Sequence, residues 1–159
     1  MKESLELRIY GLVPYNLSPI QQGIQFGHAV VEYGLNHFGE KNYLDWANNH
    51  KTFIILNGGT TNSSIDPETG NPKGTLNQHA VILRDMGIPF CYFHEPDLGD
   101  QLTAVVFLVD EYVFNKEKYP DPRDPDPLNT DWAWADHLTY GELSKVIQMR
   151  DFLKQFRLA

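Results

Sequence analysis

The stretch of residues 18–30, Ser-Pro-Ile-Gln-Gln-Gly-Ile-Gln-Phe-Gly-His-Ala-Val, has the form of a helix that begins directly after a turn. Ser18 is a typical helix cap, Pro19 suits the first helical position, and Gln21 completes the S-x-x-Q pattern of a capping box. The preceding residues 5–13 alternate in the manner of a β-strand. The stretch therefore predicts a strand–turn–helix unit.

The predicted helix carries two columns of side chains. Apolar residues recur at spacings of three and four, which predicts that they face the core; they are Ile20, Ile24, Gly27, Val31, Leu35 and Phe38. A polar column runs beside them and consists of Gln21, Gln25, His28 and Glu32. Gly23 and Gly27 lie one turn apart, where small residues let another backbone or a ligand come close.

Strands and helices follow one another along the rest of the chain. Further strands are expected at residues 51–56, 88–94 and 103–109, the first of them buried on both faces. A short helix is expected at residues 43–49, a second at 76–86 and a terminal one at 139–156, with Lys145, Arg150, Lys154 and Arg157 exposed. Residues 57–74 form either a long loop or a small hairpin that turns at 67–70. This order predicts an α/β fold, a three-layer α/β sandwich with a mixed sheet of about four strands.

The composition divides the chain into three parts. With 159 residues and 42% hydrophobic positions, the chain can bury one core. We expect an α/β domain over residues 1–114, an acidic proline-rich extension over 115–138, and a helix over 139–159 that packs on the same domain. The extension contains Pro-Asp-Pro-Arg-Asp-Pro-Asp-Pro at residues 120–127, which excludes helix and central strand because proline lacks the backbone donor.

The chain is strongly acidic, with 13 Lys and Arg against 21 Asp and Glu and a net charge of −8. Residues 95–136 hold eleven acidic and three basic residues, and therefore the whole of that net charge. A chain of this kind binds phosphate backbones weakly in general, although the remainder is balanced.

The cysteine content and the hydropathy bear on the role of Cys91 and on the cellular location expected for the protein. Cys91 is the single cysteine and lies in the apolar run 88–93, which favours a buried apolar role over that of a nucleophile. The first residues contain no apolar leader, and no run approaches the roughly 18 apolar residues of a membrane span. We expect a cytoplasmic protein that does not enter the membrane.

Three groups of residues could carry chemistry. Gln21, Gln25 and His28 lie near the start of a helix, where the helix dipole favours anionic ligands and an imidazole can move a proton. Equally, His28 could be a half-buried histidine with the glutamines facing solvent. Residues 94–97, His-Glu-Pro-Asp, offer carboxylates at a strand end, although such residues are also ordinary turn formers and Thr103 an ordinary strand former.

Two other interpretations are weaker. A metal site at His94, Glu95 and Asp97 has no fixed-spacing motif behind it, so we predict no metal and no cofactor. Trp132, Trp134 and Tyr140 could stack on bases or bind a peptide, but we favour a role in fastening the extension to the core.

The pattern from Gln21 to Val30, followed by Gly87-Ile88-Pro89 and a turn into Thr103, resembles the type-2 peptidyl-tRNA hydrolases over about residues 5–112. In that family the first helix carries Lys-x-x-x-Gln-x-x-His-Ala, a strand ends in an Asp-Ala-Gly turn, and a threonine begins the last strand. Gln25, His28 and Thr103 match these positions. The lysine position holds Gln21, and the aspartate turn becomes Glu95-Pro96-Asp97.

The resemblance implies cleavage of an ester between an acyl group and a tRNA ribose. Glu95 or Asp97 would act as base or orient water, His28 and Gln25 would position the substrate, Gln21 would polarise the carbonyl, and Thr103 would support the site. The alternative is a non-catalytic module of the same fold that holds a small ligand, a nucleotide or a protein partner. The implied partners are tRNA, with binding weakened by the acidic segment, a protein that meets the C-terminal extension, and a second copy in a homodimer.

Overall fold

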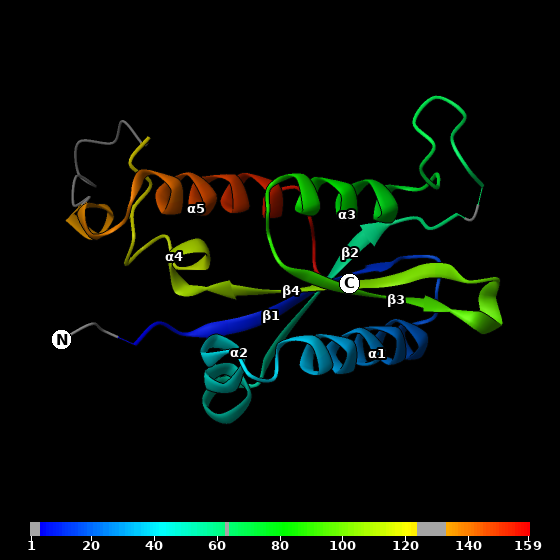
Figure 1. The fold of residues 1–159 in the computed structure, drawn as a ribbon, viewed down its shortest axis with the longest axis horizontal. Coiled ribbons are helices and arrows are strands. Elements are labelled where there is room, and N and C mark those ends of the chain that lie inside the picture. Colours follow the sequence, from blue (N-terminus) through cyan, green and yellow to red (C-terminus); the bar gives the residue numbers. More distant parts are fainter. Residues whose placement is uncertain (1–3, 63, 124–132) are drawn as a thin grey trace. The chain divides into compact units, whose positions relative to one another are not determined.

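The structure is a computed structural model that describes residues 4–62, 64–123 and 133–159 (Figure 1). It divides into two compact units. The sheet unit comprises Leu7–Leu108 together with Phe156–Ala159, and the C-terminal unit comprises Met1–Glu6 together with Val109–Gln155.

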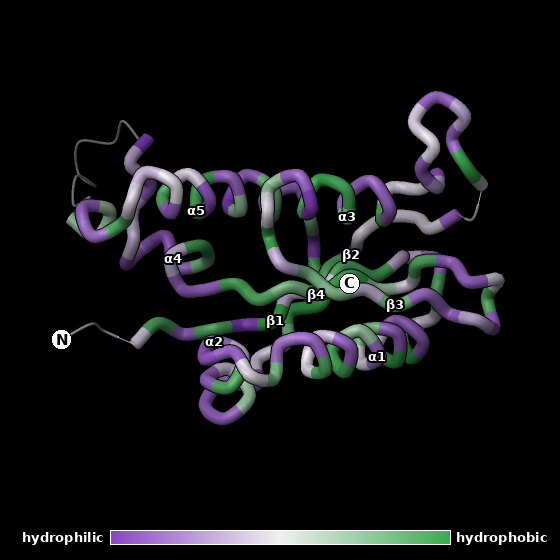
Figure 2. Tube along the Cα trace, viewed as in Figure 1, coloured by the Kyte–Doolittle hydropathy of each residue, from purple (hydrophilic) through white to green (hydrophobic). Residues whose placement is uncertain are grey.

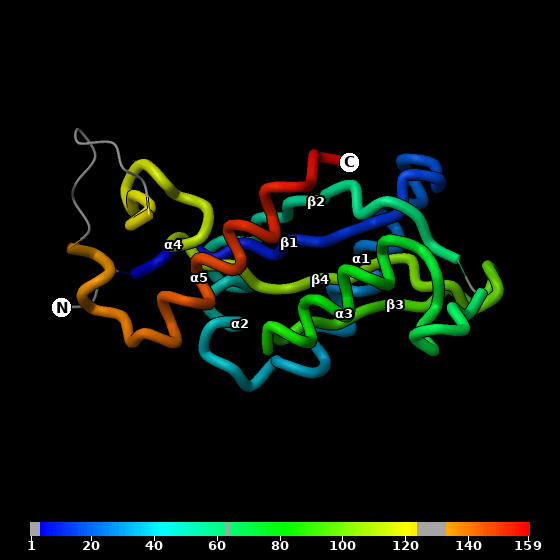
Figure 3. The backbone as a smooth tube through the Cα atoms, turned by 90° about the horizontal axis from the view of Figure 1, so that it is seen from above, coloured from blue at the N-terminus to red at the C-terminus, as the bar shows by residue number. Residues whose placement is uncertain are grey.

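A mixed four-stranded sheet organises the sheet unit. Its strands are β1 (Leu7–Pro14), β2 (Thr52–Gly59), β3 (Phe90–Glu95) and β4 (Gln101–Asp110), in the order β2-β1-β4-β3 (Figure 3). Strands β1 and β2 are parallel, with Arg8 opposite Thr52, whereas β3 and β4 are antiparallel, with Phe90 opposite Phe107. The sheet is predominantly hydrophobic (Figure 2), as expected for strands covered by helices.

Helices cover both faces of this sheet. Helix α1 (Pro19–His37) packs on β1 and β3, and α3 (Thr75–Asp85) packs on β1 and β2 from the opposite face (Figure 1). The short α2 (Lys41–Asp45) continues into the π-helical turn η1 (Trp46–His50). The predicted α/β sandwich with a mixed sheet is confirmed.

The face of α1 that packs on the sheet differs from the predicted one. The buried residues of α1 are Gln25, Phe26, Ala29 and Tyr33. The apolar column expected in the core is instead exposed, with exposed fractions of 73% for Ile20, 63% for Val31 and 70% for Phe38. The prediction was wrong because two apolar columns share the helical spacing, and the one with the larger rings fills the space above the sheet.

The structure also tests the predictions for strand β2 and for residues 57–74. Strand β2 lies at an edge of the sheet and Phe53 is 51% exposed, so the expectation of burial on both faces was wrong. Residues 57–74 contain the predicted hairpin, closed by a bridge between Ile65 and Pro72 and a hydrogen bond from Asp66 N to Asn71 O of 2.8 Å.

The C-terminal unit contains α4 (Glu111–Phe114), the 3₁₀ turn η3 (Ala133–His137) and α5 (Tyr140–Leu153), which is shorter than predicted. Arg150 was expected on the surface but is only 3% exposed. Its guanidinium donates to the carbonyls of Tyr112 and Tyr119 and lies 5.3 Å from the centre of the Trp134 ring. The carbonyl of Tyr112 in α4 and that of Tyr119 beyond it make this burial possible, and they carry no signal in the sequence.

The aromatic cluster predicted in this region is partly described. Trp134 is buried and donates to Pro120 O at 2.9 Å, a contact within the C-terminal unit, whereas Tyr140 is 90% exposed. The predicted role in fastening the extension to the core stays a prediction. Trp132 and most of the Asp-Pro segment lie outside the described residues. Among the described helices, none has the length and apolar character needed to cross a membrane.

Gly11 on β1 provides a direct test of the packing under α1. A Cβ at Gly11 would lie 2.2 Å from Cε2 of Phe26, whereas a Cβ at Gly23 would meet nothing within 4 Å. We expect Gly11→Ala to lower the free energy of unfolding by about 1–3 kcal/mol through overpacking. The control Gly23→Ala, at an exposed helical position, should leave it unchanged or raise it by up to about 1 kcal/mol. Urea unfolding measures both, and equal effects would contradict the packing described.

Candidate functional site

A hollow of about 430 Å³ lies where the first turns of α1 meet the end of β3 and the 3₁₀ turn η2 (Pro96–Leu98). Its lining combines amides, an imidazole, carboxylates and aliphatic side chains; the residues are Leu17, Gln21, Ile24, Gln25, His28, Glu95, Asp97 and Leu98. This hollow, called the α1–η2 hollow below, is contained entirely in the sheet unit. A concave, partly apolar site with a few convergent polar groups is typical of ligand binding.

The turn before α1 fixes the position of the α1 residues that line the hollow. Ser18 Oγ accepts a hydrogen bond from Gln21 N at 3.3 Å, which confirms the predicted cap. The side chain of Gln22 donates to Pro14 O at 3.3 Å and to Leu17 O at 3.1 Å. Gln22 therefore fastens the helix to the strand that precedes it, a role that its place in the sequence did not indicate.

Gln25 is the central polar group beneath the hollow and is only 2% exposed. Its Oε1 accepts from Thr103 Oγ1 at 2.6 Å, and its Nε2 donates to Glu95 Oε2 at 3.1 Å. A carboxylate can only accept, so it fixes which end of the amide faces Glu95 and which faces Thr103. The Nε2 atom also lies 3.5 Å from Gln21 Oε1.

Glu95 is held at both of its carboxylate oxygens. Gln25 donates to Oε2, and the backbone N–H of Asp97 donates to Oε1 at 3.3 Å as η2 begins. Because Pro96 follows Glu95, the chain turns away from the strand at once, and the Glu95 carboxylate lies in the lining of the hollow. The arrangement gives a carboxylate of defined orientation with lone pairs left to accept a proton or a hydrogen bond.

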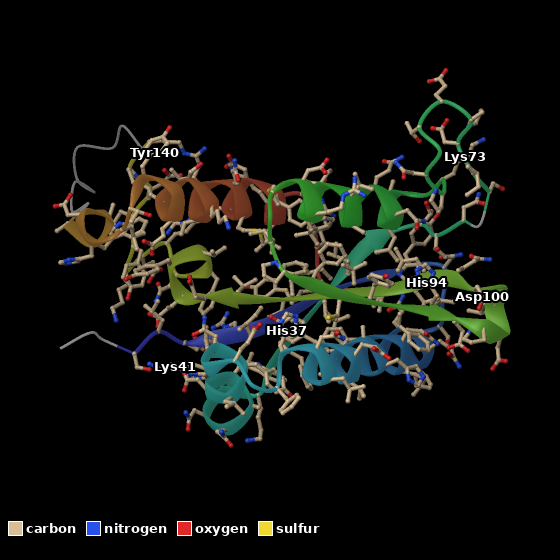
Figure 4. The ribbon with its side chains drawn as sticks, in the orientation of Figure 1. His37, Lys41, Lys73, His94, Asp100 and Tyr140 are labelled. Atoms are coloured by element: carbon tan, nitrogen blue, oxygen red, sulfur yellow. The ribbon has the colours of Figure 1, made fainter. Side chains whose placement is uncertain are left out.

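His28, also on α1, is a further lining residue of the hollow. Its ring stacks on Phe93, with ring centres 4.5 Å apart and an angle of 26° between the planes. Phe93 thus faces α1, whereas the His94 ring lies against Tyr92, with ring centres 5.2 Å apart. His94 does not line the hollow, and its Nδ1 lies 2.9 Å from Asp100 O in the β3–β4 turn (Figure 4).

The charge of the hollow is negative. Glu95 and Asp97 line it, and among its described lining residues none is lysine or arginine. Within residues 4–62, 64–123 and 133–159, no group of three or more His, Cys, Asp and Glu side chains could hold a metal ion. His94, Glu95 and Asp97 are thus not brought together as a group of this kind.

Cys91 is buried in the core between α1 and the sheet and does not line the hollow. Burial raises the pKa of its thiol, and the negative charges of Glu32 and Glu40 raise it further. A thiol of raised pKa is a poor nucleophile at neutral pH, so the favoured apolar role of Cys91 is supported.

The structure brings most of the expected site residues together. Gln21, Gln25, His28, Glu95 and Asp97 line the hollow, and Thr103, which is fully buried, reaches it only through Gln25. Sequence reasoning missed the apolar part of the lining: Leu17 and Leu98 lie in turns with no periodic pattern, and Ile24 was assigned to the core.

A comparison of the chain with models of known protein families finds no match, and a comparison with curated protein sequences finds none either.

The variant Gln25→Glu tests the hydrogen bond between Gln25 and Glu95. A second carboxylate at 3.1 Å from Glu95 Oε2 would raise the pKa of the pair in the folded state, because two like charges cannot both ionise cheaply. We expect the variant to lose about 2–3 kcal/mol of unfolding free energy at pH 7. The loss should shrink as the pH falls through the raised pKa, since protonation removes the repulsion.

Gln78→Glu, on the exposed side of α3, is the control for adding one acidic residue to a helix. Urea unfolding between pH 4 and pH 8 measures the difference between the two variants. A difference that does not change with pH would contradict the contact between Gln25 and Glu95.

Proposed function

We propose that the chain is a divergent type-2 peptidyl-tRNA hydrolase-like enzyme that hydrolyses an acyl ester of tRNA. The observation that carries the proposal is the Glu95 carboxylate, held by Gln25 Nε2 and Asp97 N in the lining of a hollow that His28 also lines. A fixed carboxylate and an imidazole on one cavity are the groups that water-dependent ester cleavage requires. The reaction would take place in the cytoplasm, with tRNA as partner.

In the proposed reaction Glu95 orients a water molecule and accepts its proton as the oxygen attacks the ester carbonyl. The Gln21 amide donates a hydrogen bond to the carbonyl oxygen as negative charge develops on it. The tetrahedral intermediate then collapses, the bond from carbon to the ribose oxygen breaks, and protonated His28 gives its proton to that oxygen. The products are a carboxylic acid and a free ribose hydroxyl.

Gln25 and Thr103 act in this scheme as positioning residues. Gln25 is 2% exposed and both ends of its amide are engaged, so its effect on the reaction passes through the orientation of Glu95. Leu17, Ile24 and Leu98 give the hollow an apolar surface, which suits the acyl group better than the tRNA phosphates.

A non-catalytic binding role is the second candidate. It is favoured by the lack of lysine and arginine among the described residues of the hollow, which leaves nothing there to pair with phosphate. Such a module would hold a neutral or cationic small ligand in the hollow. The acidic extension is the surface that we propose for a protein partner in either case.

Release of an N-blocked amino acid from its tRNA tests the catalytic proposal. We expect turnover by the purified chain, reduced about 10²–10⁴-fold in His28→Ala and in Glu95→Gln because each removes a proton-transfer group. Glu68→Gln, which changes an exposed carboxylate in the 57–74 hairpin, is the control and should keep full activity. No turnover by the unaltered chain would overturn the proposal and favour the binding role.

The Gln21→Lys variant tests whether the group at position 21 stabilises the negative charge that develops on the carbonyl oxygen. A charged donor makes a hydrogen bond about twice as strong as a neutral one, so we expect hydrolysis to rise about tenfold. Gln78→Lys on α3 adds the same charge away from the hollow and controls for a general gain in attraction to tRNA. An equal rise in both variants would show that attraction to tRNA alone is responsible.

A further inference from the structure

Asp97 is a second carboxylate in the α1–η2 hollow, and the proposed reaction uses only its backbone N–H. The Asp97 side chain lines the hollow and is exposed, and no other group within residues 4–62, 64–123 and 133–159 forms a hydrogen bond or ion pair with its carboxylate. Glu95 is held by a neutral amide and a backbone N–H, so in the described part of the chain it too has no cation beside it. A carboxylate without a counter-ion on the surface of a hollow favours a ligand of positive charge.

The charges of the hollow do not balance within the chain. Glu95 and Asp97 line the hollow, and none of its described lining residues is lysine or arginine. In the proposed reaction His28 is protonated, which offsets one of the two negative charges and leaves the other. Like charges close together repel each other, so a cationic ligand stabilises the pair of carboxylates and a phosphate group does the opposite.

The turn η2 holds the two carboxylates near each other. Asp97 N donates to Glu95 Oε1 at 3.3 Å, and Asp100 N donates to Glu95 O at 2.9 Å, so hydrogen bonds close the turn on both sides of Asp97. A ligand that reaches both carboxylates must therefore carry the two groups that they recognise close together. An α-aminoacyl ester has this arrangement, because its ammonium group is on the carbon next to the ester carbonyl.

The lining also provides a surface for an apolar side chain. Ile24 is 44% exposed and Leu98 is 40% exposed, and Leu17 lies in the lining with them. The volume of about 430 Å³ is in the lower part of the range for small-ligand sites, which suits a single amino acid residue. The hollow thus combines an apolar surface with an unpaired negative charge.

We propose that Asp97 binds the α-ammonium group of an aminoacyl ester, so that the hollow takes a free aminoacyl group in preference to an N-blocked one. The substrate class is an amino acid with an apolar side chain, esterified at its carboxyl group and unblocked at its nitrogen. That this ester is hydrolysed rests on the proposed function, whereas the ammonium site does not.

The assignment makes Asp97 a specificity-determining residue. The bonds that break and form are those of the proposed reaction, and the ammonium group keeps its protons throughout. Acylation of the nitrogen removes the charge and leaves one N–H, and a neutral donor makes a hydrogen bond about half as strong as a charged one. It also adds a bulky group beside the Asp97 carboxylate, so an N-blocked ester is the poorer substrate.

Binding of two amides that differ in one group tests the ammonium site without any hydrolysis. Phenylalaninamide carries an ammonium group on its α carbon at about pH 6, whereas 3-phenyllactamide carries a hydroxyl group there. We expect phenylalaninamide to shift the backbone amide NMR signals of residues 97–98 and to bind at least about fivefold more tightly. Asp97→Asn should remove most of this difference.

Asp100→Asn is the matched control for Asp97→Asn. It removes the same charge from an exposed residue of the β3–β4 turn (Figure 4) that does not line the hollow. The preference for phenylalaninamide should persist in this variant. Equal binding of the two amides by the unaltered chain, or a preference that Asp97→Asn leaves intact, would overturn the ammonium site.

Hydrolysis of three esters of one tRNA separates the substrate class from the proposed function. They are phenylalanyl-tRNA, phenyllactyl-tRNA and N-acetylphenylalanyl-tRNA, and each rate is divided by the spontaneous rate of the same ester, because an ammonium group itself activates the ester. We expect the corrected kcat/KM to be at least about fivefold higher for phenylalanyl-tRNA than for the other two. This preference should fall in Asp97→Asn and persist in Asp100→Asn.

The two measurements distinguish failure of the substrate class from failure of the proposed function. Turnover of all three esters without preference would contradict the substrate class and leave the hydrolase proposal in place. Selective binding of phenylalaninamide with no turnover of any ester would contradict the hydrolase proposal and support the ammonium site alone.

Discussion

The buried amide of Gln25 is the interaction on which the site depends. It joins three elements, because α1 supplies the amide, β4 supplies the Thr103 hydroxyl and β3 supplies the Glu95 carboxylate. A polar side chain that is 2% exposed is tolerated only when both of its ends are satisfied. The carboxylate fixes the orientation of the amide, and the amide in turn fixes the orientation of the carboxylate. One side chain therefore joins α1 to β3 and β4 beside the hollow.

The charges of the molecule indicate that a tRNA substrate and its reacting ester would be bound at different places. The hollow contains Glu95 and Asp97 but no lysine or arginine among its described residues, so the proposed reaction would rest on a held carboxylate and a neutral amide. A tRNA substrate would then have to be held elsewhere along the sheet unit, through residues outside the hollow. Lys73 in the hairpin and Lys41 at the start of α2, both labelled in Figure 4, are examples of exposed basic residues on that unit. The reacting ester alone would enter the hollow.

Local sequence signals predicted the elements well, because each signal acts within a few residues. Ser18 and Pro19 marked the start of α1, and the Gly70 turn belongs to the hairpin that was one of two alternatives. The orientation of α1 was not predictable in the same way. Two apolar columns have the same period, and the choice between them depends on the space above Gly11 that receives the Phe26 ring. Arg150 was misjudged for a similar reason, since its carbonyl partners lie 31 and 38 residues away.

Among the site residues, those on the polar column were identifiable by type and spacing, whereas the link through Thr103 spans 78 residues.

A double-mutant cycle on Gln25 and Thr103 tests the central claim most directly. Thr103→Val leaves Gln25 Oε1 without its donor, whereas Gln25→Leu leaves the Thr103 hydroxyl with Phe93 O at 3.3 Å and removes the donor to Glu95. Each should lower the unfolding free energy by about 1–3 kcal/mol. The double variant removes both groups, so its loss should be smaller than the sum of the two by about 1 kcal/mol or more. Losses that add to within about 0.5 kcal/mol would mean that the two side chains do not interact, and the description of the site would fail.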